Sequence, residues 1–416
     1  MNKKILVISW FYPPVNSSEG LVTYKLLKGS KYNYDVFTQK DNELWCYDNK
    51  TELPLTDNVD TIFSNANNLK DWMKEAIDYY KRNKEKYSMV MTRSMPPESH
   101  IVGIKIKEIS PEIKWIASFG DPISNSPYVE IADQYYRNYS IKKSKELRWI
   151  ISPKRIIKNS IKGMLYIKNR YRNVKQEKKI QHKVLKKADV LIFNNEYQKK
   201  YMIQKKYEGK SYVIPHSFDS SLYPNEENKK DDKVKITYVG HLDDIRSPKF
   251  FLQAIKKLKD EDPNLNEKVT VEFYGSMGQM DKVYIIDEEL TDIIKVRKSV
   301  TYRESLKIMQ NSDWLLMVDA DISEAVKYNI FFAAKLADYI GTGKQIIGIT
   351  MPEGVTADIL HNMNAIKTSH CIEEIKNYLW LIIYQKYYPD INRDYQIQYD
   401  CKNVAIKLDE ILEKID

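Results

Sequence analysis

The chain has 416 residues, of which 43% are apolar and 30% charged, with a net charge of +9. This composition excludes a disordered chain, and the length favours two or three domains over one. The three cysteines lack metal-binding spacing and no apolar run reaches the roughly 20 residues of a membrane helix, so we expect a cytoplasmic protein without disulfides.

Short apolar runs alternate with helical patterns along the chain. Such alternation predicts an α/β protein whose doubly wound parallel sheets are covered by helices on both faces. Ligands bind such sheets at the carboxyl ends of the strands, so two sheets favour a cleft between domains. The expected strands are Lys4–Trp10, Tyr34–Thr38, Ser88–Thr92, Trp115–Phe119 and Val190–Phe193, then Val234–Val239, Val269–Tyr274, Trp314–Val318 and Gln345–Thr350.

A polar, charged segment at 223–233 separates the two series and is expected to be a linker. The expected organisation is an N-terminal domain at 1–222, a C-terminal domain at 234–390, and a C-terminal helix within 391–416. That helix has an apolar face able to pack back on the first domain, although the sequence does not show where.

Two first-domain loops carry candidate ligand-binding residues. Ser18, Glu19 and Gly20 begin a helix after the first strand, where they suit an anion or sugar hydroxyls, although serines there are also ordinary caps. Asp121 directly follows a buried strand, where it either contacts substrate hydroxyls as an orienting group or base, or simply opens a turn before proline. His100 either faces the cleft or is a helix-capping, partly buried histidine.

The positive charge is concentrated in residues 137–187. This insert contains eighteen Lys or Arg and two acids, a net charge of +16, which leaves −7 for the rest of the chain. Ile157, Ile161, Met164 and Leu165 share one helical face, and a basic amphipathic helix lies well on an anionic membrane. A solvated lysine-rich hairpin is the alternative; nucleic acid is not expected as a partner, because no recognition motif accompanies the charge.

The second domain opens with a strand, a turn at Gly240 and a loop containing Arg246. A glycine allows a ligand to approach the backbone, and a guanidinium donates to phosphate through two N–H groups. Later, a loop leads into a short helix with Lys335 and Asp338 on about the same side. The helix N-terminus attracts anions, so this stretch suits a nucleotide. An ordinary β-α-β unit with a solvated ion pair is the alternative.

In order and spacing, these segments resemble the GT-B glycosyltransferases, in particular the large retaining family 4. The resemblance covers nearly the whole chain, through the Pro-Pro loop ending at Gly20, Ile214–Asp219, Gly240 to Arg246, Tyr302–Leu306 and Phe331–Gly348. It implies two Rossmann-like domains facing a cleft, with a nucleotide-sugar donor in the C-terminal one.

The resemblance also implies roles for single residues. Arg246 would neutralise the donor diphosphate, and the turn at Ile330–Phe332 would bring backbone N–H groups to it. Asp338 stands where the family uses a glutamate to hold the ribose, with Lys335 in the same motif. The region just before Tyr302 would line the nucleobase.

Three positions depart from the family pattern. Asp338 is one methylene shorter than glutamate, Ile330 replaces the first glutamate of a pair, and Gly120-Asp121 occupies the place of a sugar-contacting histidine. Asp319 and Asp321 match a metal-binding Asp-x-Asp only in spacing, because they lie too late in the chain for the fold that uses that motif. No metal or cofactor is therefore expected.

The implied activity moves a sugar, with retention, from a nucleotide diphosphate to a glycan or lipid-linked acceptor. Arg246, Lys335 and helix N–H groups would stabilise the leaving diphosphate, while Asp121 orients donor or acceptor. We expect a peripheral enzyme of bacterial surface polysaccharide synthesis at the inner face of the plasma membrane. A nucleotide-sugar epimerase of the same fold and a non-catalytic membrane-associated scaffold are the alternatives.

Overall fold

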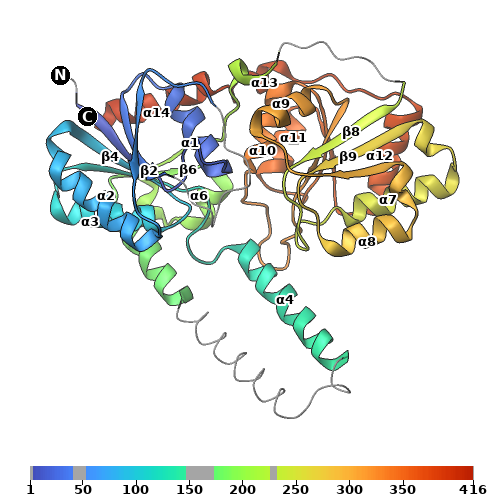
Figure 1. Ribbon diagram of the computed structural model, residues 1–416, viewed down its shortest axis with the longest axis horizontal. Coiled ribbons are helices and arrows are strands. Elements are labelled where there is room, and N and C mark those ends of the chain that lie inside the picture. Colours follow the sequence, from blue (N-terminus) through green and yellow to red (C-terminus); the bar gives the residue numbers. More distant parts are fainter. Residues whose placement is uncertain (1–2, 41–52, 147–172, 225–231, 416) are drawn as a thin grey trace.

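The computed structural model describes residues 3–40, 53–146, 173–224 and 232–415, without the side chains of 137–146. Two α/β domains lie side by side, each built on one sheet whose strands all pair in parallel (Figure 1). The predicted architecture of two helix-covered parallel sheets is confirmed.

The first sheet has seven strands in the order β3-β2-β1-β4-β5-β6-β7. Alternate residues of a strand point to opposite faces, so Ile5 and Val7 of β1 join one core cluster while Leu6 and Ile8 join another. The strands are β1 Lys4–Ile8, β2 Tyr34–Gln39, β3 Val59–Ser64, β4 Tyr87–Arg93, β5 Lys114–Ser118, β6 Val190–Phe193 and β7 Ser211–Val213.

Helices cover both faces of the first sheet. Helices α2 and α3 pack on one face, through Trp72, Ala76 and Val102, and α1 packs on the other beside α14. The first-domain helices are α1 Ser18–Lys28, α2 Leu69–Asn83, α3 Glu98–Ile109, α4 Pro127–Glu146 and α6 Glu196–Met202, and residues 173–187 are also helical. Helix α4 projects away from the two domains (Figure 1).

The second sheet has six strands in the order β10-β9-β8-β11-β12-β13. Helices α7 and α12 bury one face of it, and α9, α10 and α11 bury the other. The strands are β8 Val234–Val239, β9 Val269–Tyr274, β10 Ile294–Arg297, β11 Trp314–Val318, β12 Gln345–Ile349 and β13 Ile366–Thr368. The helices are α7 Lys249–Glu261, α8 Gln279–Asp287, α9 Tyr302–Gln310, α10 Ala334–Thr342, α11 Val355–Asn362 and α12 Ile372–Tyr384.

The chain returns to the first domain after the second is complete. Helix α13 (Arg393–Ile397) leads into α14 (Cys401–Ile415), whose residues Val404, Leu408 and Ile411 are part of the first-domain core. The Oγ of Ser30 donates to Asp409 at 2.5 Å, which fixes α14 beside α1. Residues 225–231 of the expected linker lie outside the described residues.

Candidate active site

A cleft of about 440 Å³ lies between the two domains. Its walls come from segments that follow β1, β5 and β7 in the first domain and β8, β9, β10 and β11 in the second, together with helices α9 and α10. The carboxyl ends of both sheets therefore open toward one another, which is the arrangement expected for ligand binding in parallel α/β sheets.

Two basic side chains line the second-domain wall of this cleft. Within the described residues, neither Arg246 nor Lys335 forms an ion pair, and the buried Nε of Arg246 has no hydrogen-bond partner. The Lys335 ammonium donates to the hydroxyl of Tyr238. Burial, and then the nearby Arg246 charge, hold the pKa of Lys335 well below its usual value. An anion bound here would satisfy both side chains.

Glycine at position 240 makes room for this pair. Gly240 has φ +126°, and a Cβ at that position would lie 2.5 Å from Lys335 Nζ. Gly275 has φ +133°, and its Cβ would lie 2.1 Å from the Gly240 carbonyl oxygen. The turns at Gly240 and Gly275 therefore pack directly against each other through their backbones, and the backbone at Gly240 contacts the Lys335 side chain.

The arginine loop is held from the first domain. The carboxylate of Asp243 accepts the N–H groups of Ile245 and Arg246 through Oδ1, at 2.9 and 2.8 Å. Its Oδ2 accepts the hydroxyl of Tyr128, on α4, at 2.5 Å. The Arg246 guanidinium lies 5.7 Å from the centre of the Tyr128 ring. The orientation of Arg246 therefore depends on contact between the domains.

The segment before α10 is partly turned away from the cleft. Ile330 is fully buried outside the cleft lining, and its carbonyl oxygen accepts from Asn195 Nδ2 at 2.9 Å. The Phe331 N–H donates to the side chain of Asn329 at 2.9 Å. Phe331, Phe332 and the first residues of α10 do line the cleft. Among the described residues, the N–H groups of Phe332, Ala334 and Lys335 have no acceptor, so the donors left for a ligand come from both the predicted turn and the start of α10.

Asp338 lines the cleft and is held in place by one residue from each domain. Its Oδ1 accepts from Lys25 Nζ of α1 at 2.5 Å and from the Tyr302 hydroxyl at 2.9 Å. The Lys25 and Asp338 side chains are 1% and 7% exposed. No described donor contacts Oδ2. One carboxylate oxygen is therefore fixed across the domain boundary, while the other remains open to a ligand.

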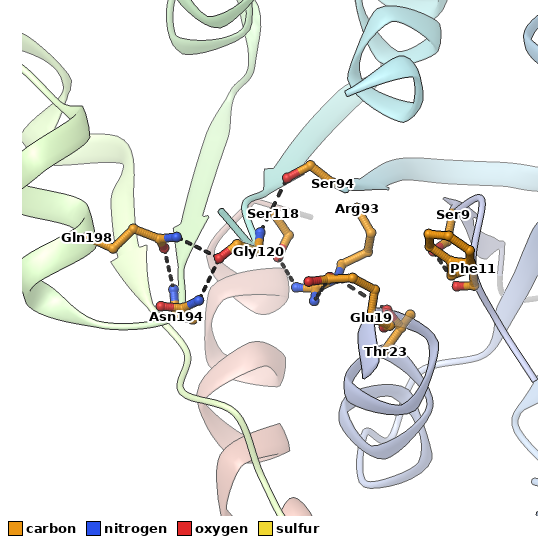
Figure 2. A network of polar contacts seen from close by, with 10 residues as sticks. All are labelled: Ser9, Phe11, Glu19, Thr23, Arg93, Ser94, Ser118, Gly120, Asn194 and Gln198. Carbon is orange, nitrogen blue, oxygen red and sulfur yellow. Dashed lines mark hydrogen bonds and ion pairs between the residues drawn. The ribbon is translucent and has the colours of Figure 1, made fainter. Parts of the chain in front are cut away.

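The first-domain wall contains a second ion pair, between Glu19 and Arg93. Arg93 Nη2 lies 3.3 Å from Glu19 Oε2, Nη1 donates to Ser118 at 2.7 Å, and Nε donates to Thr23 at 3.2 Å. Figure 2 shows Glu19 held in this way against Gly120, where a Cβ would lie 2.6 Å from Glu19 Oε1. Burial, opposed by Arg93, raises the pKa of Glu19 to about 7.

The loop carrying Asp121 is fixed by the same network (Figure 2). The carbonyl oxygen of Gly120 accepts from Asn194 Nδ2 and Gln198 Nε2, both at 2.7 Å, and its N–H donates to Ser94 Oγ at 3.3 Å. Asp121 follows at the cleft surface, and burial raises the pKa of its carboxyl while the Arg246 charge lowers it. A rigid loop thus presents Asp121 toward the opposite domain.

Of the two buried histidines His100 and His216, only His216 lines the cleft. His100 is fully buried outside the cleft lining, where Nδ1 pairs with Thr92 Oγ1 at 2.7 Å. The expectation that His100 faces the cleft is wrong, because α3 turns it into the core. His216 does line the cleft, stacked on Phe332 with ring centres 5.0 Å apart. It lies in the segment Ile214–Asp219, for which the sequence suggested no role.

Of the residues predicted to form the site, the cleft brings together Ser18, Glu19, Asp121, Gly240, Arg246, Tyr302, Phe331, Phe332, Lys335 and Asp338. Ser299 and Val300, just before Tyr302, also line it. Gly20 is buried and packs on the backbone of Tyr12. The sequence reasoning missed Lys25, Arg93 and His216. The one available signal was a lysine within the apolar run of α1.

Asp319, in the Asp-x-Asp sequence, is engaged by protein groups. Its Oδ2 accepts from Asn329 Nδ2 and Thr350 Oγ1, both at 2.7 Å. Asp321 accepts from the N–H of Ser323 at 3.1 Å. Among the described residues, no group of three or more His, Cys, Asp or Glu side chains is arranged to hold a metal ion.

Most of the basic insert lies outside the described residues, including the apolar positions between 147 and 172 on which the membrane prediction depends. In the part of the chain that the structure describes, no helix has the length and apolar character required to cross a membrane.

Neither a protein-family model nor a curated protein matches the sequence. Solved structures do match over the whole length. Sucrose-phosphate synthase from Thermosynechococcus elongatus has a TM-score of 0.68 at 12% identity and covers 100% of this chain and 99% of its own. An α,α-trehalose-phosphate synthase from Burkholderia xenovorans, solved with glucose-6-phosphate, has a TM-score of 0.60 at 9% identity, with both chains covered completely. A UDP-N-acetylglucosamine 2-epimerase has a TM-score of 0.53 at 10% identity, covering 100% and 96%.

These similarities extend over both domains and the cleft between them, at sequence identities that establish architecture alone. The chain therefore has the GT-B fold, with two Rossmann-like domains facing a common cleft.

Proposed function

We propose that this protein is a glycosyltransferase that takes a sugar from a nucleotide-diphosphate donor bound on the second-domain wall of the cleft. One observation carries the proposal. Arg246 and Lys335 lack a charge partner among the described residues and lie near the start of α10, while Asp338 keeps an open oxygen on the same helix. Two cations and helix N–H groups suit a diphosphate, and an open carboxylate oxygen suits ribose hydroxyls.

The same groups would assist cleavage of the bond between sugar and diphosphate. Negative charge grows on the diphosphate as the sugar leaves, and fixed positive groups stabilise it without having to reorganise. The tether from Asp243 to the Arg246 loop and the room left by Gly240 for Lys335 provide that fixed geometry. Asp121 would face the reacting sugar from the first domain, where it orients donor or acceptor.

The test is calorimetric titration with uridine, guanosine and adenosine diphosphates. We expect one of them to bind, and Arg246→Ala or Asp338→Ala to weaken it about 10- to 100-fold, since a hydrogen bond to a charged group contributes about 1.5–3 kcal/mol. Lys249→Ala is the matched control, because Lys249 is exposed, lies close by in sequence and is outside this cleft. Unchanged affinity in both site variants would remove the assignment.

A nucleotide-sugar epimerase is the second candidate. The observation behind it is that Glu19, Asp121 and His216 line the cleft, where proton transfer to and from a bound sugar would need such groups. One structure with this architecture is an epimerase. Incubating each nucleotide sugar without acceptor separates the two functions. A new epimer of the nucleotide sugar indicates epimerisation. A nucleotide sugar that stays unchanged alone but is consumed when an acceptor is added indicates transfer.

We further propose that transfer proceeds with retention to a glycan or lipid-linked acceptor of bacterial surface polysaccharide synthesis, on the inner face of the membrane. The basic charge of 137–187 supports the membrane part of this proposal, because each lysine or arginine near an anionic surface adds about 1 kcal/mol. Flotation with anionic liposomes should fall as salt rises, and equal flotation with neutral liposomes would contradict an electrostatic contact.

The anomeric configuration of the product, read by NMR, tests retention. Turnover by the purified chain excludes a non-catalytic scaffold.

A further inference from the structure

Glu19 occupies a position that otherwise has the properties of an anion site. The first-turn N–H groups of Ser18, Glu19 and Gly20 have no acceptor among the described residues, and they carry the positive end of the α1 dipole. Arg93, only 6% exposed at its side chain, directs its guanidinium to the side chain of Glu19 in this first turn. A helix N-terminus and an arginine together commonly bind phosphate. Here the side chain of Glu19 occupies the place of the anion and pairs with the arginine.

The remaining charges on this wall do not replace the one that Glu19 removes. Lys25 is the sole basic side chain among the described first-domain residues that line the cleft, and it is paired with Asp338. Asp121 adds a second carboxylate, whose charge acts on Glu19. An incoming phosphate would therefore meet two acids and no free cation on the first-domain side.

His216 supplies the polar groups that a neutral ligand needs. The residue is 6% exposed and lines the cleft, and its buried ring nitrogens make no hydrogen bond of good geometry within the described residues, the backbone of Phe332 being a weak partner. Burial, and then the charges of Arg93 and Lys25, lower the pKa of His216 to about 3, so the ring is neutral at physiological pH. A neutral imidazole has one donor and one acceptor nitrogen, which matches a sugar hydroxyl.

We propose that Glu19, Asp121 and His216 bind the acceptor through hydroxyl groups of a sugar ring that bears no phosphate, and that Glu19 excludes phosphorylated sugars. This inference rests on the proposed function and specifies its acceptor class. It separates the protein from fold relatives such as the trehalose-phosphate synthase solved with glucose-6-phosphate. In a lipid-linked acceptor, the phosphate groups would have to lie beyond the reacting sugar.

The experiment measures a gain of binding, which a misfolded variant cannot mimic. Glucose 6-phosphate, inorganic phosphate and glucose are titrated calorimetrically into the wild type, Glu19→Gln and Glu19→Ala. We expect both variants to bind the two phosphates at least tenfold more tightly than the wild type, with no gain for glucose. The double variant Glu19→Ala/Arg93→Met should lose the gain, because it lacks the guanidinium.

Binding of phosphate to Arg246 and Lys335 contributes equally in the wild type and in every variant, so it does not affect the comparison of their affinities. Glu98→Ala is the charge-matched control. Glu98 lies in the first turn of α3, in the same domain but outside the cleft lining, so its removal should change phosphate affinity less than twofold.

The inference is overturned if the wild type binds glucose 6-phosphate as tightly as the Glu19 variants, or if the gain survives without Arg93. Nucleoside-diphosphate binding is measured on the same samples. Normal nucleotide binding without a phosphate gain rejects the acceptor inference alone, whereas no nucleotide binding rejects the proposed function whatever Glu19 does.

Discussion

The Lys25–Asp338 ion pair offers a quantitative test of how the two domains are held together. Lys25→Met keeps the length of the side chain but removes its charge. Asp338 then keeps only the Tyr302 hydroxyl, at a site where the two paired side chains are 1% and 7% exposed. Removing one partner of a buried pair costs about 3–5 kcal/mol, because the other charge stays desolvated. We expect the free energy of unfolding to fall by that amount.

The double variant Lys25→Met/Asp338→Leu distinguishes a stranded charge from lost packing. Replacing both partners by apolar side chains removes the uncompensated carboxylate, and such replacements are often neutral or stabilising. We therefore expect the double variant to recover most of the loss. Urea unfolding, followed by tryptophan fluorescence and circular dichroism, gives the comparison. Lys257→Met is the control, since its pair with Glu373 is exposed and its loss should leave the urea midpoint unchanged.

A double variant as unstable as Lys25→Met would refute this reasoning, because the loss would then come from packing around the lysine. A Lys25→Met variant with an unchanged free energy of unfolding would also refute it. The Asp338 carboxylate would then not need the positive charge of Lys25 from the opposite domain.

Three further predictions concern single residues. Burial raises the pKa of Glu19 from its usual 4.5 to about 7, so between these values the native state holds a proton that the unfolded state releases. The free energy of unfolding attributable to Glu19 should fall by about 3–4 kcal/mol at most as pH rises through that window. The urea midpoint of the wild type should therefore fall with pH more steeply than that of Glu19→Gln, and equal pH dependence of the two midpoints would contradict this prediction. Gly240→Ala should weaken nucleotide binding at least tenfold and lower Tm, because its Cβ meets Lys335 at 2.5 Å; Gly209→Ala, with nothing within 4 Å, should do neither. His216→Phe should raise the KM for acceptor while donor affinity persists, and an unchanged acceptor KM would count against its proposed role.

The central strands were predictable because they are buried on both faces. Strands such as β6 and β11 are apolar at nearly every position, which is typical of parallel sheets. The edge strands β3, β10, β7 and β13 were not predicted. β3 and β10 expose much of their surface, and β7 and β13 have three residues each, so none gives a continuous apolar run.

Local motifs explain why the second-domain wall of the cleft was easier to predict than the residues that support it. Arg246, Lys335 and Asp338 each lie in a short segment whose turn and helix pattern indicate a ligand-facing position. Lys25, in contrast, contacts Asp338 across 313 positions of sequence, and Arg93 contacts Glu19 across 74. No spacing rule connects such pairs. Only the three-dimensional structure shows that Glu19 and Lys25 of α1 are each paired with a residue of opposite charge.

The position of α14 has a consequence for how the protein is made. Phe218 pairs with Tyr399 and Cys401 through backbone hydrogen bonds of 3.0 and 2.7 Å, so the chain leaves and re-enters the first domain at one point (Figure 1). The second domain is thus an insertion, and residues 401–415 complete a core begun at Ile5. During translation, the first domain is complete only after the second has been synthesised, and the apolar surface that α14 covers beside α1 stays exposed until then.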